Sequence, residues 1–150
     1  MTEHTFVQFR VRDTVFGLPV EQVAEIIRVV AITPVPSPHP EVLGTINLRG
    51  AAVPILDLGV ALGLGGSAVS LRMFVVIAEV EGETIGVLAD DVEDVVAIDD
   101  SRVRESRAYN GEGTFAAAVA TTHEGVFTVV ELIPLLDRLA ARPAARDEAG

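Results

Sequence analysis

The sequence contains no cysteine, no lysine and no tryptophan, and only 5% of its residues are aromatic. Without cysteine the chain can form no disulfide, no thiolate metal site and no cysteine nucleophile. Without lysine it lacks the residue that a Walker A phosphate-binding loop requires. It also has no apolar run near the about 18 residues that span a bilayer, and its N-terminus lacks the basic and apolar regions of a signal peptide. These absences predict a soluble, cytoplasmic protein with no direct membrane insertion.

Positive charge is scarce as well. The basic residues are all arginine, and 11 of them against 22 acidic residues give a formal net charge of -11. A chain this acidic repels phosphate backbones, so nucleic acid is excluded as an expected partner. The 150 residues are 49% apolar, which is typical of a folded domain with a sizeable core. We predict a single domain over residues 1–142, followed by a flexible C-terminal tail at residues 143–150.

Short segments that alternate between apolar and polar residues run through most of the chain. Val7, Phe9 and Val11 fall on one face of the first such segment, as in a half-buried strand. Glu81-Gly82 and Glu124-Gly125 mark the turns of two hairpins. The pattern predicts about nine or ten short strands, at a spacing typical of barrels or sandwiches and not of alternating βαβ units. We therefore predict a mainly β fold of two small barrels side by side.

Four segments depart from this alternation. After Pro19, the apolar residues Val20, Val23, Ala24 and Ile27 follow helical spacing, which predicts a short helix. Four prolines at alternate positions within residues 34–40 predict an extended connection that cannot be an interior strand. Residues 101–114 are predicted to form a polar loop, and residues 133–142 a terminal helix.

Catalytic motifs are nearly absent. The sequence has no glycine-rich nucleotide-binding motif, no HExxH and no GxSxG, and its three histidines lie far apart. The acidic residues Asp90, Asp91, Glu93 and Asp94 are the best candidates for metal binding or acid–base catalysis. A solvated turn and strand edge is the favoured interpretation, since charge there prevents edge-to-edge pairing. No nucleophile accompanies them, so we predict no catalytic residue, no metal and no cofactor.

The segment GTINLRG at residues 44–50 places polar side chains in an otherwise apolar stretch between two glycines. Strand alternation predicts that Ile46 and Leu48 face the core while Asn47 and Arg49 face away. Two interpretations remain open from the residues alone. Arg49 either forms an ion pair with a neighbouring carboxylate such as Asp57, or it presents its guanidinium to a partner protein.

Three segments resemble, in order and in spacing, the CheW family of bacterial chemotaxis adaptor proteins. They are residues 6–28, 33–58 and 72–99, and their most specific part is GxINLRG followed by VPILDL. The resemblance implies two intertwined SH3-like five-stranded β-barrels with short helices and a C-terminal helix. It also implies a non-catalytic adaptor that couples the cytoplasmic tips of transmembrane chemoreceptors to the regulatory domain of a CheA-type histidine kinase. Such a protein is recruited from the cytoplasm to membrane receptor arrays.

The resemblance further implies six partner-binding positions. They are carried over from the family's motifs onto Val23, Glu25, Gly44, Asn47, Arg49 and Gly86. Receptor contact in the family involves a groove between the barrels, and the glycine that Gly86 matches belongs to the second barrel. The last hairpin departs from the family pattern, with Glu131 where aspartate is usual, so contacts in that region transfer less safely.

Two alternatives to chemotaxis coupling are carried forward. The first is an adaptor of a related motility or developmental chemosensory array other than swimming, which the same fold would serve. The second is a metal-dependent hydrolase that uses Asp90, Asp91 and Asp94.

Overall fold

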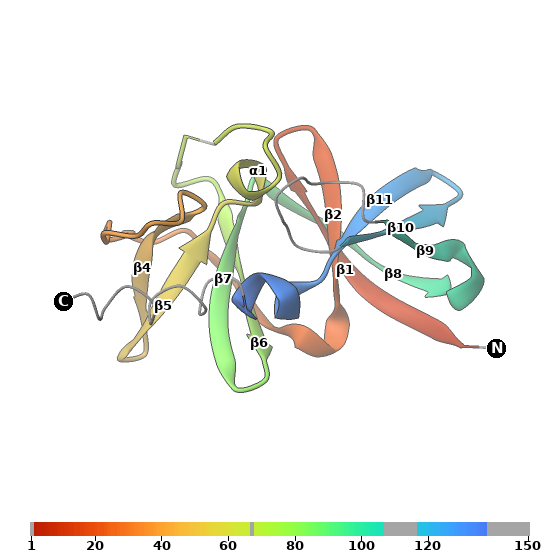
Figure 1. Ribbon diagram of the computed structural model, residues 1–150, viewed down its shortest axis with the longest axis horizontal. Coiled ribbons are helices and arrows are strands. Elements are labelled where there is room, and N and C mark those ends of the chain that lie inside the picture. Colours follow the sequence, from red (N-terminus) through yellow and green to blue (C-terminus); the bar gives the residue numbers. More distant parts are fainter. Residues whose placement is uncertain (1, 67, 107–116, 138–150) are drawn as a thin grey trace.

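The strands of the protein form two sheets that curl into neighbouring barrels (Figure 1). The computed structural model describes residues 2–66, 68–106 and 117–137, which contain eleven strands. The first barrel is a five-stranded sheet in the order β3-β6-β7-β5-β4, formed by β3 (Val23–Arg28), β4 (Val42–Leu48), β5 (Ala51–Leu56), β6 (Phe74–Val80) and β7 (Glu83–Ala89). The second barrel is a six-stranded sheet in the order β8-β1-β2-β11-β10-β9, formed by β1 (Glu3–Val11), β2 (Thr14–Pro19), β8 (Asp91–Asp99), β9 (Val103–Ser106), β10 (Ala117–Thr122) and β11 (Gly125–Val130).

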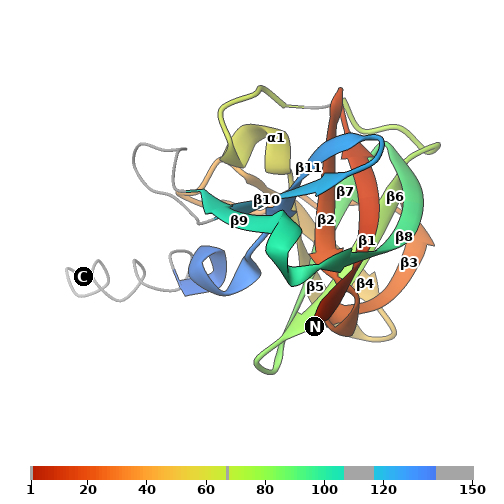
Figure 2. The same ribbon diagram turned by 90° about the vertical axis from the view of Figure 1, so that its right-hand side faces the viewer.

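In each sheet, the two edge strands follow one another directly along the chain. In the second barrel, β8 leads through the short 3-10 helix η2 (Asp100–Arg102) directly into β9. In the first barrel, the chain leaves β3 and returns alongside β4, where Thr33 pairs with Thr45 through two backbone hydrogen bonds of 2.8 and 2.9 Å. Figure 2 shows the same two sheets from the side, with β8, β9 and β1 of the second barrel towards the viewer.

The two barrels interlock because the chain does not fill them in order. The N-terminal hairpin β1–β2 belongs to the second barrel, where β1 pairs with β8 and β2 runs parallel to β11. The middle of the chain, from β3 to β7, forms the first barrel by itself. Neither half of the sequence therefore contains a complete second barrel.

Apolar side chains form three clusters, one inside each barrel and one shared between them. The first barrel encloses Val29, Ile46, Val53, Ile55, Met73, Val75, Ile77 and Leu88. The second encloses Phe6, Ile98, Ala118, Ala120, Phe127 and Val129. The shared cluster joins both sheets, with Phe9 and Phe16 from one and Val76 and Val87 from the other. Strands β6 and β7 are apolar almost throughout because one face lines a barrel interior and the other lies in the shared cluster.

Two short helices pack on the shared cluster. Helix α1 (Leu58–Ala61) begins at Asp57, whose carboxylate accepts hydrogen bonds from the backbone N–H groups of Gly59 and Val60 at 2.8 and 3.3 Å. Residues 132–137 are also helical and contribute Leu132 and Leu135 to the same cluster. Among the helices the structure describes, none has the length and hydrophobicity needed to span a membrane.

The mainly β architecture of two SH3-like subdomains predicted from the sequence is confirmed, as are the hairpin turns and the extended proline-rich connection. The helix predicted after Pro19 is wrong. Only the 3-10 turn η1 (Val20–Gln22) forms there, and β3 follows it. Alternate residues of β3 are half-buried against the barrel, and five of its residues pair with β6, so sheet pairing overrides the helical spacing.

Three further expectations need correction or lie out of reach. The predicted loop at residues 101–114 begins with a strand, since β9 pairs with β10, and residues 107–114 lie outside the described residues. The second sheet has six strands where five were expected, and the total of eleven strands exceeds the prediction. The predicted domain end at residue 142 and the tail at residues 143–150 fall outside the described part of the chain.

Candidate functional site

Arg49 lies at the tip of the hairpin that joins β4 to β5. Both turn residues adopt positive φ, 51° for Arg49 and 89° for Gly50. Two consecutive left-handed residues make the tight turn that matches the twist of a hairpin, and glycine tolerates the second position without strain. The Asn47 side chain closes this turn, since its Oδ1 accepts a hydrogen bond of 2.9 Å from the backbone N–H of Gly50.

The Arg49 side chain reaches from this turn to strand β3. Its Nη2 donates a hydrogen bond to Oε2 of Glu25, which also forms the ion pair between them. The Arg49 side chain is 69% exposed and that of Glu25 is 32% exposed. The hydrogen bond to Glu25, together with the charge of its carboxylate, raises the pKa of the Arg49 guanidinium. An exposed pair of this kind contributes little to stability, so both groups can be engaged by a partner at small cost.

The structure identifies the carboxylate that lies beside Arg49. The expected intramolecular partner Asp57 is wrong, because Asp57 is 1% exposed and caps α1. The carboxylate that pairs with Arg49 is Glu25, which lies 24 residues away in the sequence. Sequence reasoning named both residues separately as partner contacts but had no signal for their pairing, because the proline-rich connection lies between them.

Gly44 lies on β4, in the same strand as Asn47, but it is buried. A Cβ atom at this position would lie 2.2 Å from the backbone oxygen of Thr33. The glycine therefore permits the close backbone approach that closes the first barrel. Its predicted contact with a partner stays a prediction, and the structure gives the residue a separate architectural reason.

The remaining predicted positions lie deeper. Gly86 belongs to β7 in the five-stranded sheet and is buried, and its predicted contact with a partner stays a prediction. A Cβ atom there would lie 2.6 Å from Ile55 and 2.7 Å from Val75. Val23 is half-buried and packs on the shared cluster. The structure thus gathers Glu25, Asn47 and Arg49 at one exposed edge, and sets Val23 and Gly86 behind it.

The acidic segment at residues 90–94 is occupied by contacts within the protein. Asp90 accepts a hydrogen bond from the backbone N–H of Arg12. Arg10 pairs with Asp91 at 3.8 Å and with Glu93 at 3.4 Å. Within the described residues, no three metal-ligating side chains gather into a possible site. Asp91 and Glu93 of this strand edge are therefore paired with Arg10, and Asp94 is not part of that pair.

The comparison with known proteins agrees with this architecture. Residues 5–140 match the family model of the CheW-like domain. The chain is 33% identical over 128 residues to the chemotaxis protein CheW of Rhizobium meliloti, covering 84% of this chain and 83% of that protein. It is 33% identical over 90 residues to protein FrzA of Myxococcus xanthus, covering 60% of this chain and 56% of that protein. The crystal structure of the scaffolding protein TtCheW from Thermoanaerobacter tengcongensis superposes with a TM-score of 0.76 at 27% identity, over 88% of this chain and 86% of that one.

Two interlocked SH3-like barrels with an exposed, polar hairpin edge define a scaffold that binds other proteins. The chain belongs to the CheW family, whose members are non-catalytic scaffolds of chemotaxis signalling. Membership in a non-catalytic family removes the metal-dependent hydrolase as an alternative.

Proposed function

We propose that this protein couples the cytoplasmic tips of transmembrane chemoreceptors to the regulatory domain of a CheA-type histidine kinase. The observation that carries the proposal is the meeting of Glu25 and Arg49 at an exposed edge of a chain that matches the CheW-like domain from residue 5 to residue 140. The protein would act in the cytoplasm and be recruited to receptor arrays at the membrane.

The edge of β4 supports a contact surface at this place. The segment after β3 pairs with β4 only at Thr33 and Thr45, among the residues that the structure describes. Pro34, Pro36 and Pro38 follow Thr33 and have no N–H groups to donate, so this antiparallel pairing cannot extend from Thr33 towards Leu43. Beyond Thr45, the strand runs on to Asn47 with an edge that a partner backbone or side chain can reach.

The chemistry of the edge suits a partner that carries polar or acidic groups. Arg49 offers a planar guanidinium with several donors, and Glu25 engages it through a single carboxylate oxygen. A partner carboxylate could replace Glu25 or share the guanidinium with it, as an exposed pair exchanges partners at small cost.

The experiment that tests the proposal is a binding measurement with two purified partners, the kinase regulatory domain and a receptor cytoplasmic fragment. We expect the unaltered protein to bind both, and Arg49→Ala to weaken binding to at least one by about tenfold or more. Arg72→Ala removes an exposed arginine from elsewhere on the surface and serves as the matched control. No binding of either partner by the unaltered protein would overturn the proposal.

A second candidate function is an adaptor in a chemosensory array that does not control swimming. The similarity to a relative named FrzA, from Myxococcus xanthus, favours it. Deletion of the gene separates the two functions. Loss of swimming chemotaxis supports the first, whereas normal chemotaxis with altered surface motility or development supports the second.

A further inference from the structure

The two barrels are built on one strand pattern, although their sequences differ. The order β3-β6-β7-β5-β4 in the first corresponds to β8-β1-β2-β11-β10 in the second. The pairing directions also agree at every step, including the single parallel pair, β7 with β5 and β2 with β11. Strand β9 occupies the place that the Thr33 bridge holds in the first barrel.

The registers turn this correspondence into a match of individual residues. In the parallel pairs, Ile55 lies opposite Gly86 and Val129 lies opposite Gly17. The pairing of β3 with β6 and that of β8 with β1 both shift register at the same step. Beyond the shift, Ile26 pairs with Val76 in the first barrel, and Val95 pairs with Val7 in the second. Glu25 immediately precedes Ile26 and Asp94 immediately precedes Val95, so Glu25 of β3 corresponds to Asp94 of β8.

The hairpin tips correspond in the same way. Leu48 pairs with Ala51 across the first tip, and Thr122 pairs with Gly125 across the second. The two-residue turns between them place His123 where the first barrel has Arg49. The second barrel therefore has the carboxylate of the Glu25–Arg49 pair, as Asp94, but no arginine above it.

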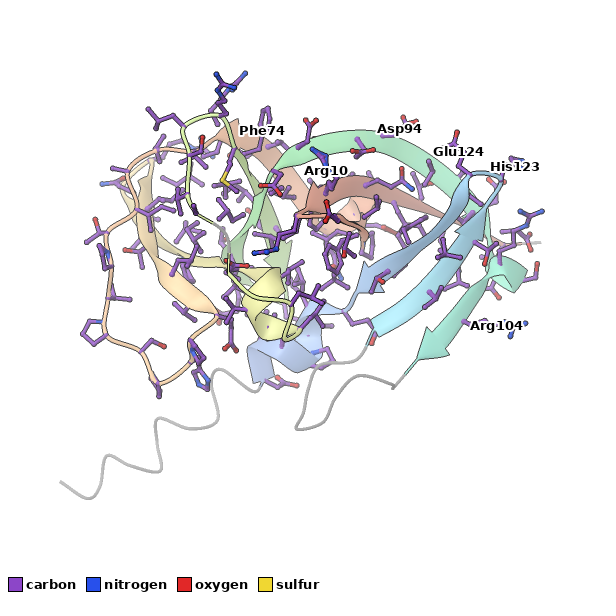
Figure 3. All side chains as sticks on the ribbon, turned by 90° about the horizontal axis from the view of Figure 1, so that it is seen from above. Arg10, Phe74, Asp94, Arg104, His123 and Glu124 are labelled. Atoms are coloured by element: carbon purple, nitrogen blue, oxygen red, sulfur yellow. The ribbon has the colours of Figure 1, made fainter. Side chains whose placement is uncertain are left out.

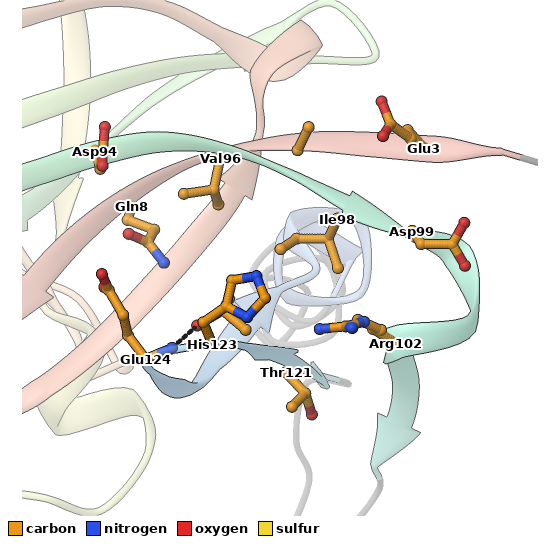
Figure 4. A pocket seen from close by; sticks show the side chains of 12 residues that line it. Glu3, Gln8, Asp94, Val96, Ile98, Asp99, Arg102, Thr121, His123 and Glu124 are labelled. Atoms are coloured by element: carbon orange, nitrogen blue, oxygen red, sulfur yellow. Dashed lines mark hydrogen bonds between the residues drawn. The ribbon is translucent and has the colours of Figure 1, made fainter.

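A cavity of about 450 Å³ lies at this position in the second barrel, between β8 and the β10–β11 turn (Figure 4). Asp94, Gln8 and Glu124 lie at one end of it, and Asp99 and Arg102 at the other. Viewed from above, Asp94 on β8 lies on the same side of this barrel as His123 and Glu124 of the β10–β11 turn (Figure 3).

The carboxylates at the Asp94 end are not neutralised within the described residues. The Asp94 carboxylate accepts a hydrogen bond only from the backbone N–H of Val95, at 2.8 Å. Neither the Glu124 carboxylate nor the Gln8 side chain forms a hydrogen bond or ion pair in that part of the chain. Arg102 and Asp99 line the far end, where hydrogen bonds from Ser101 and, to a smaller degree, the charge of Arg102 lower the pKa of the Asp99 carboxyl. The Asp94 end thus presents two carboxylates, beside the amide of Gln8, to an incoming cation.

We propose that this cavity binds an arginine side chain presented by a partner protein, in the way that Arg49 lies against Glu25 in the first barrel. The planar guanidinium can donate to Asp94 and Glu124 together, and the Gln8 oxygen can accept a further bond. Val126, which is 65% exposed and lies opposite Thr121 of the cavity wall, provides an apolar rim for the rest of the segment. The net charge of -11 favours the approach of a basic segment.

This surface is separate from the edge around Arg49, so the proposal does not depend on the proposed function. Its test uses the full-length chain and no receptor or kinase. The probe is an acetylated and amidated peptide, Asn-Leu-Arg-Gly-Ala, copied from the chain's own hairpin. The control peptide carries citrulline, which keeps the shape of arginine and removes its charge.

Backbone amide signals followed by NMR report where each peptide binds. We expect the arginine peptide to shift the signals of Asp94, His123 and Glu124, and the citrulline peptide to bind at least about tenfold more weakly. The double variant Asp94→Asn/Glu124→Gln should weaken the arginine peptide by about tenfold or more. Asp91→Asn removes a carboxylate from the same strand outside the cavity and should leave binding unchanged.

Two outcomes would overturn the proposal. One is equal binding of the arginine and citrulline peptides, and the other is a pattern of shifted signals that excludes the cavity. A thermal melt of each variant confirms that it is folded. These side chains lie at the cavity mouth and not in the apolar clusters, so we expect the melts to match that of the unaltered chain.

Discussion

The first barrel closes against a proline-rich connection, whereas the second closes against a strand. Thr33 makes one bridge to β4, but β9 pairs with β10 at four positions. The outer edge of β4 in the first barrel is therefore largely unpaired within the described part of the chain, whereas the corresponding edge of β10 in the second barrel is covered by β9. The part of β4 that leads to Asn47 and to Arg49 at the hairpin tip lies beyond the Thr33 bridge.

The interiors of the barrels differ as well. The first is filled by aliphatic side chains, and the second by two phenylalanines above alanines. Phe6 and Phe127 meet edge to face, with ring centroids 5.7 Å apart. Among the described residues, the interior of the second barrel thus combines two large aromatic rings with two alanines.

The largest expected effect follows from this difference. Phe127→Ala should lower the free energy of unfolding by about 3–5 kcal/mol, because it removes a buried ring and leaves a cavity. Val53→Ala, at the corresponding position of the first barrel, should cost roughly 2 kcal/mol. Urea unfolding curves of both variants measure the comparison. Equal losses would contradict the account of how the two interiors are filled.

A smaller effect is expected at the matched glycines. Gly17→Ala and Gly86→Ala each force a Cβ atom into occupied space and should cost about 1–3 kcal/mol. Gly17 should be the more sensitive, because its Cβ would lie 2.5 Å from the ring of Phe127, whereas the atoms nearest Gly86 are methyl ends. Thermal unfolding distinguishes them, and a larger loss at Gly86 would refute this ranking.

The two hairpin tips offer a third comparison. Asn47→Ala removes one hydrogen bond to the turn, and Thr122→Ala removes two, from the backbone N–H of Glu124 and to the carbonyl of Gly125. Each bond is worth about 1 kcal/mol, so Thr122→Ala should cost more than Asn47→Ala. Hydrogen exchange at Gly50 and Glu124 reports the local effect. Faster exchange at both tips in either variant would show that the turns are not independent.

The smallest effect concerns pH. Hydrogen bonds from the side chain and backbone of Ser101 hold the pKa of Asp99 below its ordinary value of 3.8. A carboxyl whose pKa is lowered by folding stabilises the native state above its unfolded pKa, and this contribution is lost as the pH falls through the folded pKa. Ser101→Ala should raise the pKa of Asp99 in the folded protein. It should therefore narrow the pH range, between the folded and unfolded pKa values, over which this stabilisation is lost as the pH falls. An NMR titration of the Asp99 carboxyl measures it, and an unchanged pKa would remove Ser101 as the cause.

Local signals in the sequence predicted much of the fold. The alternation of Val7, Phe9 and Val11 and the turn at Glu81-Gly82 depend on neighbouring residues, and both are confirmed. Strand β3 was missed because its apolar spacing fits a helix too, and only pairing with β6, about fifty residues away, selects the strand. Strand β9 was missed because Val103 is the single apolar residue in it.

The site was predicted only in part, for the same reason. The resemblance to the family named Glu25 and Arg49, but the contact between them depends on the path of the proline-rich segment. The match between Asp94 and Glu25 was also hidden, since the second barrel takes its first two strands from the N-terminus. The sequence held one signal of this match. Gly17 precedes Glu25 by the same number of positions as Gly86 precedes Asp94.

The central claim is that Arg49 contacts a partner and does more than pair with Glu25. The double exchange Glu25→Arg/Arg49→Glu tests it most directly, because it rebuilds the ion pair with its charges reversed. We expect the exchanged protein to melt as the unaltered one does and still to lose binding of the receptor fragment or the kinase regulatory domain by about tenfold or more. Full recovery of binding to both partners, where each single exchange abolishes it, would show that the pair acts only within the protein and would contradict the claim.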